Sequence, residues 1–182
     1  MRTQGRLYAD HEAEVAFHDV DMVGVVWHGH YVRYLENARW ALMDRLGYGL
    51  QRMIDSGFAW PIIELHTRYV GTAHFGDRLR VRASLAEWEN RIAINYLISR
   101  PADGVRILRA RTVQVAVDGR SGALQFASPP DFLAAVRAAR GRERWGLLLA
   151  EAIFNILMGI VALLFPIGAV LAFVVVTAGW SL

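Results

Sequence analysis

The residues of this chain best suited to chemistry are concentrated between His18 and Tyr31. This segment contains two aspartates, three histidines and two glycines, and an amphipathic helical pattern follows it directly. A carboxylate or an imidazole in a glycine-containing turn before a helix can activate water, and the first helix amides can bind the oxyanion that forms on a carbonyl group. The segment is therefore typical of a site that attacks a polarised carbonyl.

The elements that position this segment follow from the spacing of apolar residues. Residues 12–17 alternate between polar and apolar, which predicts a short strand, and residues 19–26 read as a loop. Apolar residues then recur at helical spacing from His30 to Leu46, and Gly47 suits a left-handed helix end. The sequence thus predicts a strand, a loop and one long helix in succession.

Strand patterns dominate the middle of the chain. After a short helix over 50–55, alternating runs bounded by turn residues predict four strands, over 60–69, 77–87, 91–99 and 106–117. A further helix is predicted over 131–140. The long helix and the antiparallel strands each have one apolar face to bury, so the simplest packing wraps a sheet around that helix. The predicted fold class is α+β.

The composition changes sharply towards the C-terminal part of the sequence. From Gly146 onward the only ionisable side chain is Glu151, and residues 152–180 carry no charge. A bilayer-crossing helix needs about 20 predominantly apolar residues. We therefore expect three parts, namely a soluble domain over 1–140, a basic linker over 141–146 and a hydrophobic membrane segment over 147–182 with one span or an incomplete hairpin.

Charge and residue types narrow the functional classes. The chain has no cysteine, which excludes disulfides, thiolate metal sites and a cysteine nucleophile. Its formal net charge is +3. Four arginines stand just before the apolar tail without an aromatic-interleaved basic face, so we expect a membrane flank rather than nucleic-acid binding, with the soluble domain on the cytoplasmic side: Arg137, Arg140, Arg142 and Arg144. The spacing of His18, His28 and His30 fits no familiar metal-ligand pattern, and we expect no metal.

The segment Asp21-Met-Val-Gly-Val-Val-Trp-His-Gly-His-Tyr31, followed by Glu36-Asn-Ala-Arg39, resembles the hotdog-fold acyl-CoA thioesterases of the 4-hydroxybenzoyl-CoA thioesterase type. The resemblance extends over roughly residues 7–140, through the segment 69–77 and the hairpin near Asp118. It implies a hotdog fold, in which an antiparallel sheet wraps around one long central helix. It also implies hydrolysis of acyl-CoA thioesters without a metal or redox cofactor.

The same resemblance implies roles for individual residues. Asp21 matches the catalytic carboxylate, which acts as general base or nucleophile, and His28 matches a residue that assists it. Gly24 matches the turn residue, and amides from Gly29 to Tyr31 would polarise the thioester carbonyl. The other positions implied to contact substrate are Val26, Trp27 and His30.

The residues themselves leave other interpretations open. Asp19 suits a structural role in a turn or cap, and His28 suits a hydrogen-bonding role at the helix start as well as a catalytic one. Arg78, Arg80 and Arg82 share one strand face, which either meets the phosphates of coenzyme A or is simply solvated. The sequence departs from the family at Phe17, where many relatives carry a tyrosine whose hydroxyl could orient water or substrate.

We therefore expect an acyl-CoA thioesterase that forms a homodimer or homotetramer and is held at the cytoplasmic membrane by its tail. The donor could also be an acyl-carrier protein. The alternative is a non-catalytic module that binds acyl-CoA or acyl-carrier protein at the membrane; a hotdog dehydratase ranks below both because nothing resembles its motif. The tail itself resembles the first hairpin of a family of small acid-resistance membrane proteins.

Overall fold

A computed structural model describes residues 7–164 of the 182-residue chain. The chain divides into two compact units, one ending at Arg140 and one beginning at Gly141, and each is described by itself. The first unit contains all of the β-strands and the segment with the candidate site.

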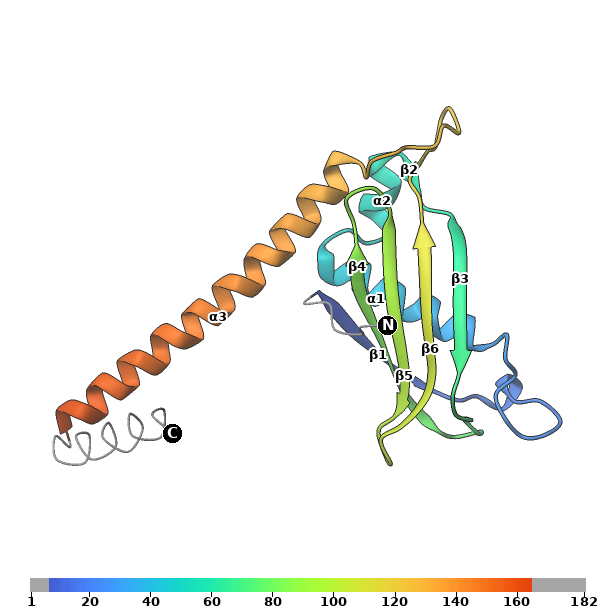
Figure 1. Ribbon diagram of the computed structural model, residues 1–182, viewed down its shortest axis with the longest axis horizontal. Coiled ribbons are helices and arrows are strands. Elements are labelled where there is room, and N and C mark those ends of the chain that lie inside the picture. Colours follow the sequence, from blue (N-terminus) through green and yellow to red (C-terminus); the bar gives the residue numbers. More distant parts are fainter. Residues whose placement is uncertain (1–6, 165–182) are drawn as a thin grey trace, which may run out of the picture. The chain divides into compact units, whose positions relative to one another are not determined.

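An antiparallel five-stranded sheet forms the body of the first unit (Figure 1). Its strands lie in the order β1 (Tyr8–Glu14), β4 (Arg78–Glu87), β5 (Ile92–Arg100), β6 (Val105–Gln114) and β3 (Ile62–Tyr69). Two short strands, β2 (Phe58–Ala59) and β7 (Val117–Asp118), pair separately. The predicted antiparallel sheet is confirmed, and it leaves β1 and β3 at the two edges.

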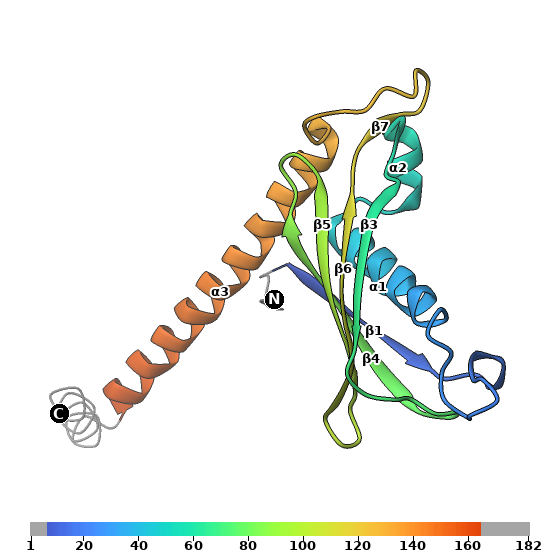
Figure 2. The same cartoon turned by 45° about the vertical axis from the view of Figure 1, so that its right-hand side comes forward.

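Helix α1 (Tyr31–Leu46) lies across one face of the sheet and packs against β1 and β4 (Figures 1 and 2). Its buried side chains recur every three or four positions, as the sequence pattern predicted. Gly47 ends the helix with a φ of 76°, a left-handed conformation that glycine adopts without strain. A short helix, α2 (Leu50–Ser56), follows.

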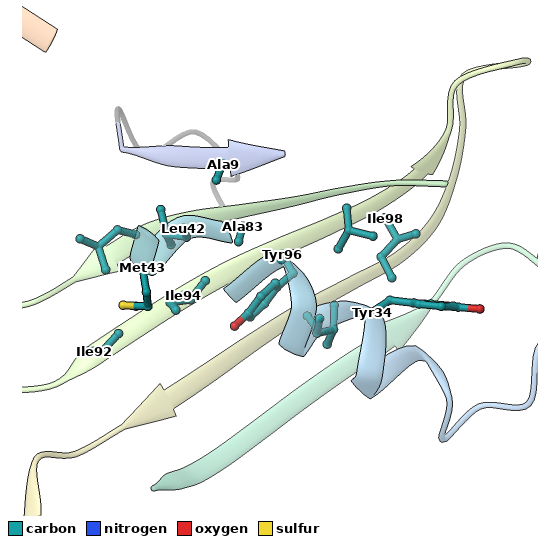
Figure 3. Packing of buried hydrophobic residues seen from close by; sticks show 14 of the residues in the cluster. Ala9, Tyr34, Leu42, Met43, Ala83, Ile92, Ile94, Tyr96 and Ile98 are labelled. Atoms are coloured by element: carbon teal, nitrogen blue, oxygen red, sulfur yellow. The ribbon is translucent and has the colours of Figure 1, made fainter. Parts of the chain in front are cut away.

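The hydrophobic core lies between α1 and the sheet (Figure 3). Leu42 and Met43 of the helix are fully buried, as are Ile94 and Tyr96 of the neighbouring strand β5. The Tyr96 hydroxyl lies 3.1 Å from the Thr112 hydroxyl, so its polar end has a partner inside the core. Burial raises the pKa of Tyr96 well above its usual range. This core anchors α1 and thereby fixes the direction in which its N-terminus points.

The first strand differs from the prediction. It spans Tyr8–Glu14 rather than residues 12–17, and Phe17–Asp19 forms a single 3₁₀ turn, η1. The register with β4 explains the shift, because Ala9 faces the core while Asp10, Glu12 and Glu14 stand opposite β4 arginines. Pairing across the strands therefore decides the boundary that local alternation misplaced.

Helix α3 (Pro130–Leu164) is much longer than the predicted helix and runs without a break through the basic linker expected over 141–146. Its first turns pack in the first unit, with Phe132 and Val136 fully buried. Within the described residues, the longest apolar stretch falls short of what a bilayer crossing requires. Charged residues occupy α3 as far as Glu151, and the rest of the expected segment, residues 165–182, lies outside the described part. The expected transmembrane segment is therefore not supported.

Candidate active site

The segment with the candidate site connects η1 to α1 and is fastened at both ends by backbone pairing. Val20 bridges to Val26, and Val25 bridges to His74 on the segment after β3. The Val26 amide donates to the Ala73 carbonyl over 2.9 Å, and the Val26 side chain is buried. Residues 20–26 therefore form a fastened hairpin-like loop. Val26 serves this loop as a core residue.

Asp21 lies at the start of the tight turn in this loop. Its carbonyl accepts from the Gly24 amide and its Oδ1 atom accepts from the Val23 amide, each over 2.9 Å. Gly24 has a φ of 81°, so a side chain at this position would strain the turn. The turn holds one carboxylate oxygen of Asp21 while the residue as a whole remains exposed. Asp21 therefore presents a fixed, accessible carboxylate.

Asp19 has the opposite environment, with only 2% of its surface exposed. Its Oδ2 atom accepts from the Tyr34 hydroxyl over 2.6 Å, and its Oδ1 atom pairs with the Arg33 guanidinium. The Asp19 carbonyl accepts from the Trp27 amide over 2.9 Å and lies 3.0 Å from Nδ1 of His30. Asp19 thus ties the loop to the first turn of α1, and His30 belongs to this network.

His28 and Trp27 lie on the exposed side of the helix start. The two rings stand 4.6 Å apart between centroids. A side chain at Gly29 would collide with the Trp27 ring, because its first carbon would lie 2.0 Å from that ring. The absence of a side chain at Gly29 therefore allows Trp27 to fold back over the helix entrance. His28 is exposed, and within the described residues no hydrogen bond or ion pair joins it to Asp21.

Of the amides from Gly29 to Tyr31 that were expected to bind an oxyanion, one already has a partner within the chain. The His30 amide donates to the Trp27 carbonyl over 2.9 Å, so that amide already has an acceptor. The amides of Gly29 and Tyr31 remain as the candidates for binding an oxyanion. Tyr31 is 3% exposed, and burial raises the pKa of its hydroxyl. The Tyr31 side chain is therefore a packed helix residue beside the loop.

Large apolar side chains surround the loop and are exposed in the single chain. Phe17 packs edge-to-face against Phe75 at 5.9 Å between ring centroids, yet the two residues are 77% and 62% exposed. Met22 and Val23, which follow Asp21 in the turn, are also exposed. Phe17 therefore contributes to an exposed apolar surface together with Phe75.

The structure adds three residues to the site that the sequence did not predict. Tyr69 donates from its hydroxyl to the His28 carbonyl over 2.9 Å and contacts the Tyr31 ring at 5.7 Å between centroids. Arg33 and Tyr34 bind the Asp19 carboxylate. Arg33 and Tyr34 lie in the first helical turn, a position that favours contact with a preceding loop, whereas no local signal marks Tyr69, which lies 41 residues from His28.

Comparisons with known proteins agree on one family. Residues 15–152 match the family described as the thioesterase-like superfamily. The chain is 27% identical over 111 residues to a putative acyl-CoA thioesterase, YneP, of Bacillus subtilis, and the aligned region covers 60% of this chain and 80% of that protein. It is 28% identical over 109 residues to a 1,4-dihydroxy-2-naphthoyl-CoA hydrolase of Synechocystis, spanning 59% of this chain and 79% of that one.

The fold comparison extends this similarity to solved structures. A crystal structure of a 1,4-dihydroxy-2-naphthoyl-CoA thioesterase from Synechocystis superimposes with a TM-score of 0.64 at 24% identity, covering 71% of this chain and 95% of that one. The hotdog arrangement expected from the sequence is thereby confirmed. These matches give no support to the second resemblance, that of the tail to small membrane proteins.

Proposed function

Because the chain belongs to the thioesterase-like superfamily, we propose that it hydrolyses acyl-CoA thioesters to a free acid and coenzyme A. The observation that carries this proposal is the position of Asp21, an exposed carboxylate fixed in the turn that leads into α1, within the part of the chain that matches the family. The names of the relatives, which act on acyl-CoA or aroyl-CoA thioesters, support the same substrate class.

The proposed chemistry begins at the carboxylate. With Oδ1 held by the Val23 amide, the other oxygen of Asp21 is available to take a proton from water or to attack the thioester carbonyl carbon itself. Negative charge then develops on the carbonyl oxygen, where the amides of Gly29 and Tyr31 would stabilise it. If Asp21 acts as a base, the activated water adds to the carbonyl, the carbon–sulfur bond breaks, and the free acid and the protonated coenzyme A thiol leave. If Asp21 attacks, the thiol leaves in the same way and a mixed anhydride remains on Asp21, which water then hydrolyses to the free acid and the original carboxylate. A thioester is already electrophilic, so no serine triad is required.

We assign the assisting role to His28, which would act by a hydrogen bond to the thioester and not by a hydrogen bond to Asp21. Its carbonyl is fixed by the Tyr69 hydroxyl and its ring by Trp27, so the imidazole stands exposed at the helix entrance. A neutral or protonated imidazole there can donate to the thioester carbonyl or to the departing sulfur. Trp27 and His30 would line the entrance for the acyl group.

A second copy of the chain can cover an exposed apolar edge of the sheet. Strand β3 lies at a sheet edge and exposes Ile62, Ile63 and Leu65, which are 43%, 55% and 41% exposed. Together with the exposed apolar residues around Asp21, this edge is an apolar surface of the kind that homodimers bury. We therefore propose a homodimer or a homotetramer built from such dimers. A monomer by sedimentation equilibrium at catalytic concentrations would contradict it.

The experiment that tests the proposed activity is thiol release from a panel of aliphatic acyl-CoA and aroyl-CoA thioesters by the full-length protein. We expect repeated turnover on at least one substrate, with one free acid formed for each thiol released. A non-catalytic binding module would instead retain acyl-CoA at one equivalent per site and release no thiol. Equilibrium dialysis with the same substrates distinguishes these two outcomes.

We also propose that α3 attaches the protein to a membrane surface, in keeping with the location expected from the sequence. Between Trp145 and Val161 the helix exposes large apolar side chains on consecutive positions, including Ile156, Leu157 and Met158. A helix attaches to a membrane surface by burying exposed apolar side chains of this kind at the lipid interface. Flotation of the full chain with phosphatidylglycerol-containing vesicles tests the attachment, and protein that stays at the bottom of the gradient would contradict it. The cytoplasmic orientation stays a prediction.

A further inference from the structure

Arginines on the outer face of the sheet, the face turned away from α1, occur in two environments. On the β1 side they stand opposite acidic residues of the neighbouring strand. Arg82 makes two hydrogen bonds of 2.7 Å to the Asp10 carboxylate, while Arg80 stands opposite Glu12 and Arg78 opposite Glu14. The Arg82 hydrogen bonds lower the pKa of Asp10. These three arginines, which the sequence suggested as candidates for coenzyme A phosphates, already face carboxylates of their own chain.

The arginines on the β3 side have no acidic residue opposite them in the neighbouring strands. Arg68 of β3 stands directly opposite Arg109 of β6, and Arg106 joins them around a cleft of about 370 Å³ whose remaining lining residue is Val70. No carboxylate lines the cleft, and across the described residues none of the three arginines forms a salt bridge. Like charges directly opposite each other destabilise a sheet. The cleft therefore gains stability from an anion that enters it.

Backbone contacts position the segments that carry these arginines. The amides of Val70 and Gly71 both donate to the Ile107 carbonyl, over 3.0 and 3.1 Å. A side chain on Gly71 would place its first carbon 2.7 Å from the Arg106 carbonyl oxygen, so glycine permits the close approach of the two segments. This approach sets Arg106 beside the end of β3. The spacing of the arginines is thus fixed by main-chain contacts.

The cleft lies at the same end of the sheet as the candidate active site. Tyr69, the next residue after Arg68, holds the His28 carbonyl and contacts Tyr31 on the side of α1. Successive residues of a strand point to opposite faces, so Arg68 projects to the other side of the strand end that Tyr69 connects to the site. In Figure 1 the tip of β3 lies beside the loop that precedes α1. A ligand extending from the loop past the C-terminal end of β3, and not across the β3 edge that we propose to pair with a second copy, would reach the arginines.

We propose that the cleft formed by Arg68, Arg106 and Arg109 binds the phosphate groups of the coenzyme A nucleotide. This inference rests on the proposed thioesterase function. Coenzyme A carries a diphosphate and a 3′-phosphate on its adenosine, separated from the thioester by the flexible pantetheine arm. Guanidinium groups bind phosphate through paired hydrogen bonds, and three of them match these two phosphate positions. The cleft holds the nucleotide while Asp21 acts on the thioester.

The test uses the full-length protein and needs two readouts. Isothermal titration calorimetry with adenosine 3′,5′-bisphosphate measures nucleotide binding without any turnover. Thiol release is measured in parallel on an acyl-CoA, its dephospho-CoA analogue and the matching acyl-pantetheine. The variants are Arg68→Gln, Arg106→Gln and Arg109→Gln, singly and combined, and the matched control on the same sheet face is Arg78→Gln combined with Arg80→Gln.

We expect each single variant to raise KM for acyl-CoA about tenfold, the size of one lost charged hydrogen bond, with kcat unchanged. The combined variant loses bisphosphate binding, while turnover of acyl-pantetheine and the control variant remain as in the wild type. Its melting temperature stays equal or rises, because the opposed charges are gone. That result also separates loss of binding from loss of fold.

Three results would overturn the proposal. The first is an unchanged KM for acyl-CoA in the combined variant while thiol release continues, which leaves the thioesterase function intact. The second is binding of inorganic phosphate as tight as that of the bisphosphate, which would make free phosphate the ligand. In the third, the variants weaken turnover of an acyl-carrier protein but not of acyl-CoA, so that the cleft docks a protein. A further outcome separates the two proposals. If the wild type releases no thiol but binds the bisphosphate, and the combined variant does not bind it, then the thioesterase function is wrong and the phosphate-binding role of the cleft is supported.

Discussion

Asp19 and Asp21 belong to the same loop, yet the fold places them in opposite environments. Asp19 is 2% exposed and its carboxylate is bound by Tyr34 and Arg33. Asp21 is exposed, and one of its oxygens is held by the Val23 amide. The comparison shows that the role of a carboxylate is decided by the partners that the fold brings to it, and not by residue type or position along the chain alone.

The two environments also divide two tasks. A buried carboxylate with a hydroxyl and a guanidinium around it fixes the loop against α1, because removing any partner would leave a buried charge without compensation. An exposed carboxylate in a rigid turn keeps its oxygen accessible to water and substrate. The loop thus holds its exposed carboxylate on a support that contains a second, buried carboxylate.

The largest effect is expected from Asp21→Asn. This change keeps the hydrogen bond to the Val23 amide through the amide oxygen but removes the basic oxygen, so kcat/KM should fall by about 10²–10⁴, the usual worth of a general base. Thiol-release kinetics measure the loss, and circular dichroism melting should show no change in stability. Activity above one tenth of the wild type would remove Asp21 from the catalytic role.

The reverse pattern is expected from Asp19→Ala. The substitution leaves the Tyr34 hydroxyl and part of the Arg33 guanidinium without their acceptor, which should cost about 1–3 kcal/mol of unfolding free energy. Urea unfolding measures this loss. The fraction that stays folded should keep measurable turnover, because the reacting carboxylate is still present. If Asp19→Ala melts like the wild type and is inactive, the roles of the two aspartates are exchanged.

A smaller effect on the rate is expected from Tyr69→Phe. The variant keeps the ring contact with Tyr31 but loses the hydrogen bond to the His28 carbonyl, whose net worth is about 1 kcal/mol. We expect kcat to fall several-fold with little change in melting temperature, because the helix entrance becomes less well fixed. Tyr96→Phe, which removes a hydroxyl within the core, serves as the control and should lower stability rather than kcat.

The smallest effect concerns a third carboxylate, Asp10. Its pKa is lowered by its hydrogen bonds to Arg82, so the pair stabilises the folded state above the unfolded pKa and this contribution disappears as the pH falls through the lower, folded value. Since the pair is partly exposed, Asp10→Asn should lose at most about 0.5 kcal/mol at pH 7. Urea unfolding at pH 7 and pH 3 should show the difference shrinking with acid. A difference that grows with acid would contradict the linkage.

Much of the fold could be predicted because local spacing governs it. The helix expected from His30 to Leu46 is observed from Tyr31 to Leu46, since its apolar stripe matches the only face that can cover the sheet. The first strand was misplaced because its limits depend on pairing with β4, which lies about seventy residues away in the chain. The continuation of α3 through 141–146 was also missed, as arginines tolerate a helix as well as a linker.

The candidate site was predictable only where a contiguous motif encodes it. Asp21, Gly24 and the helix start lie in one segment, and the structure brings them into one loop. The structural role of Asp19 was anticipated, but not its partners Arg33 and Tyr34, whose contacts arise when the loop folds back on the helix. Tyr69 and the arginine cleft depend on contacts between distant strands, for which the sequence has no local pattern.

The two edges of the sheet have a consequence for how large an assembly can grow. The exposed row on β1 consists of the charged residues Asp10, Glu12 and Glu14, which stand opposite arginines of β4, whereas β3 presents apolar residues. Charged side chains on an edge strand disfavour its pairing with another strand. Only one edge is therefore suited to pairing with another copy. Such pairing closes after two chains and cannot propagate into a continuous ribbon. The acidic edge strand thus disfavours further edge-to-edge pairing, and with it fibre formation, in a chain that has exposed hydrophobic surface.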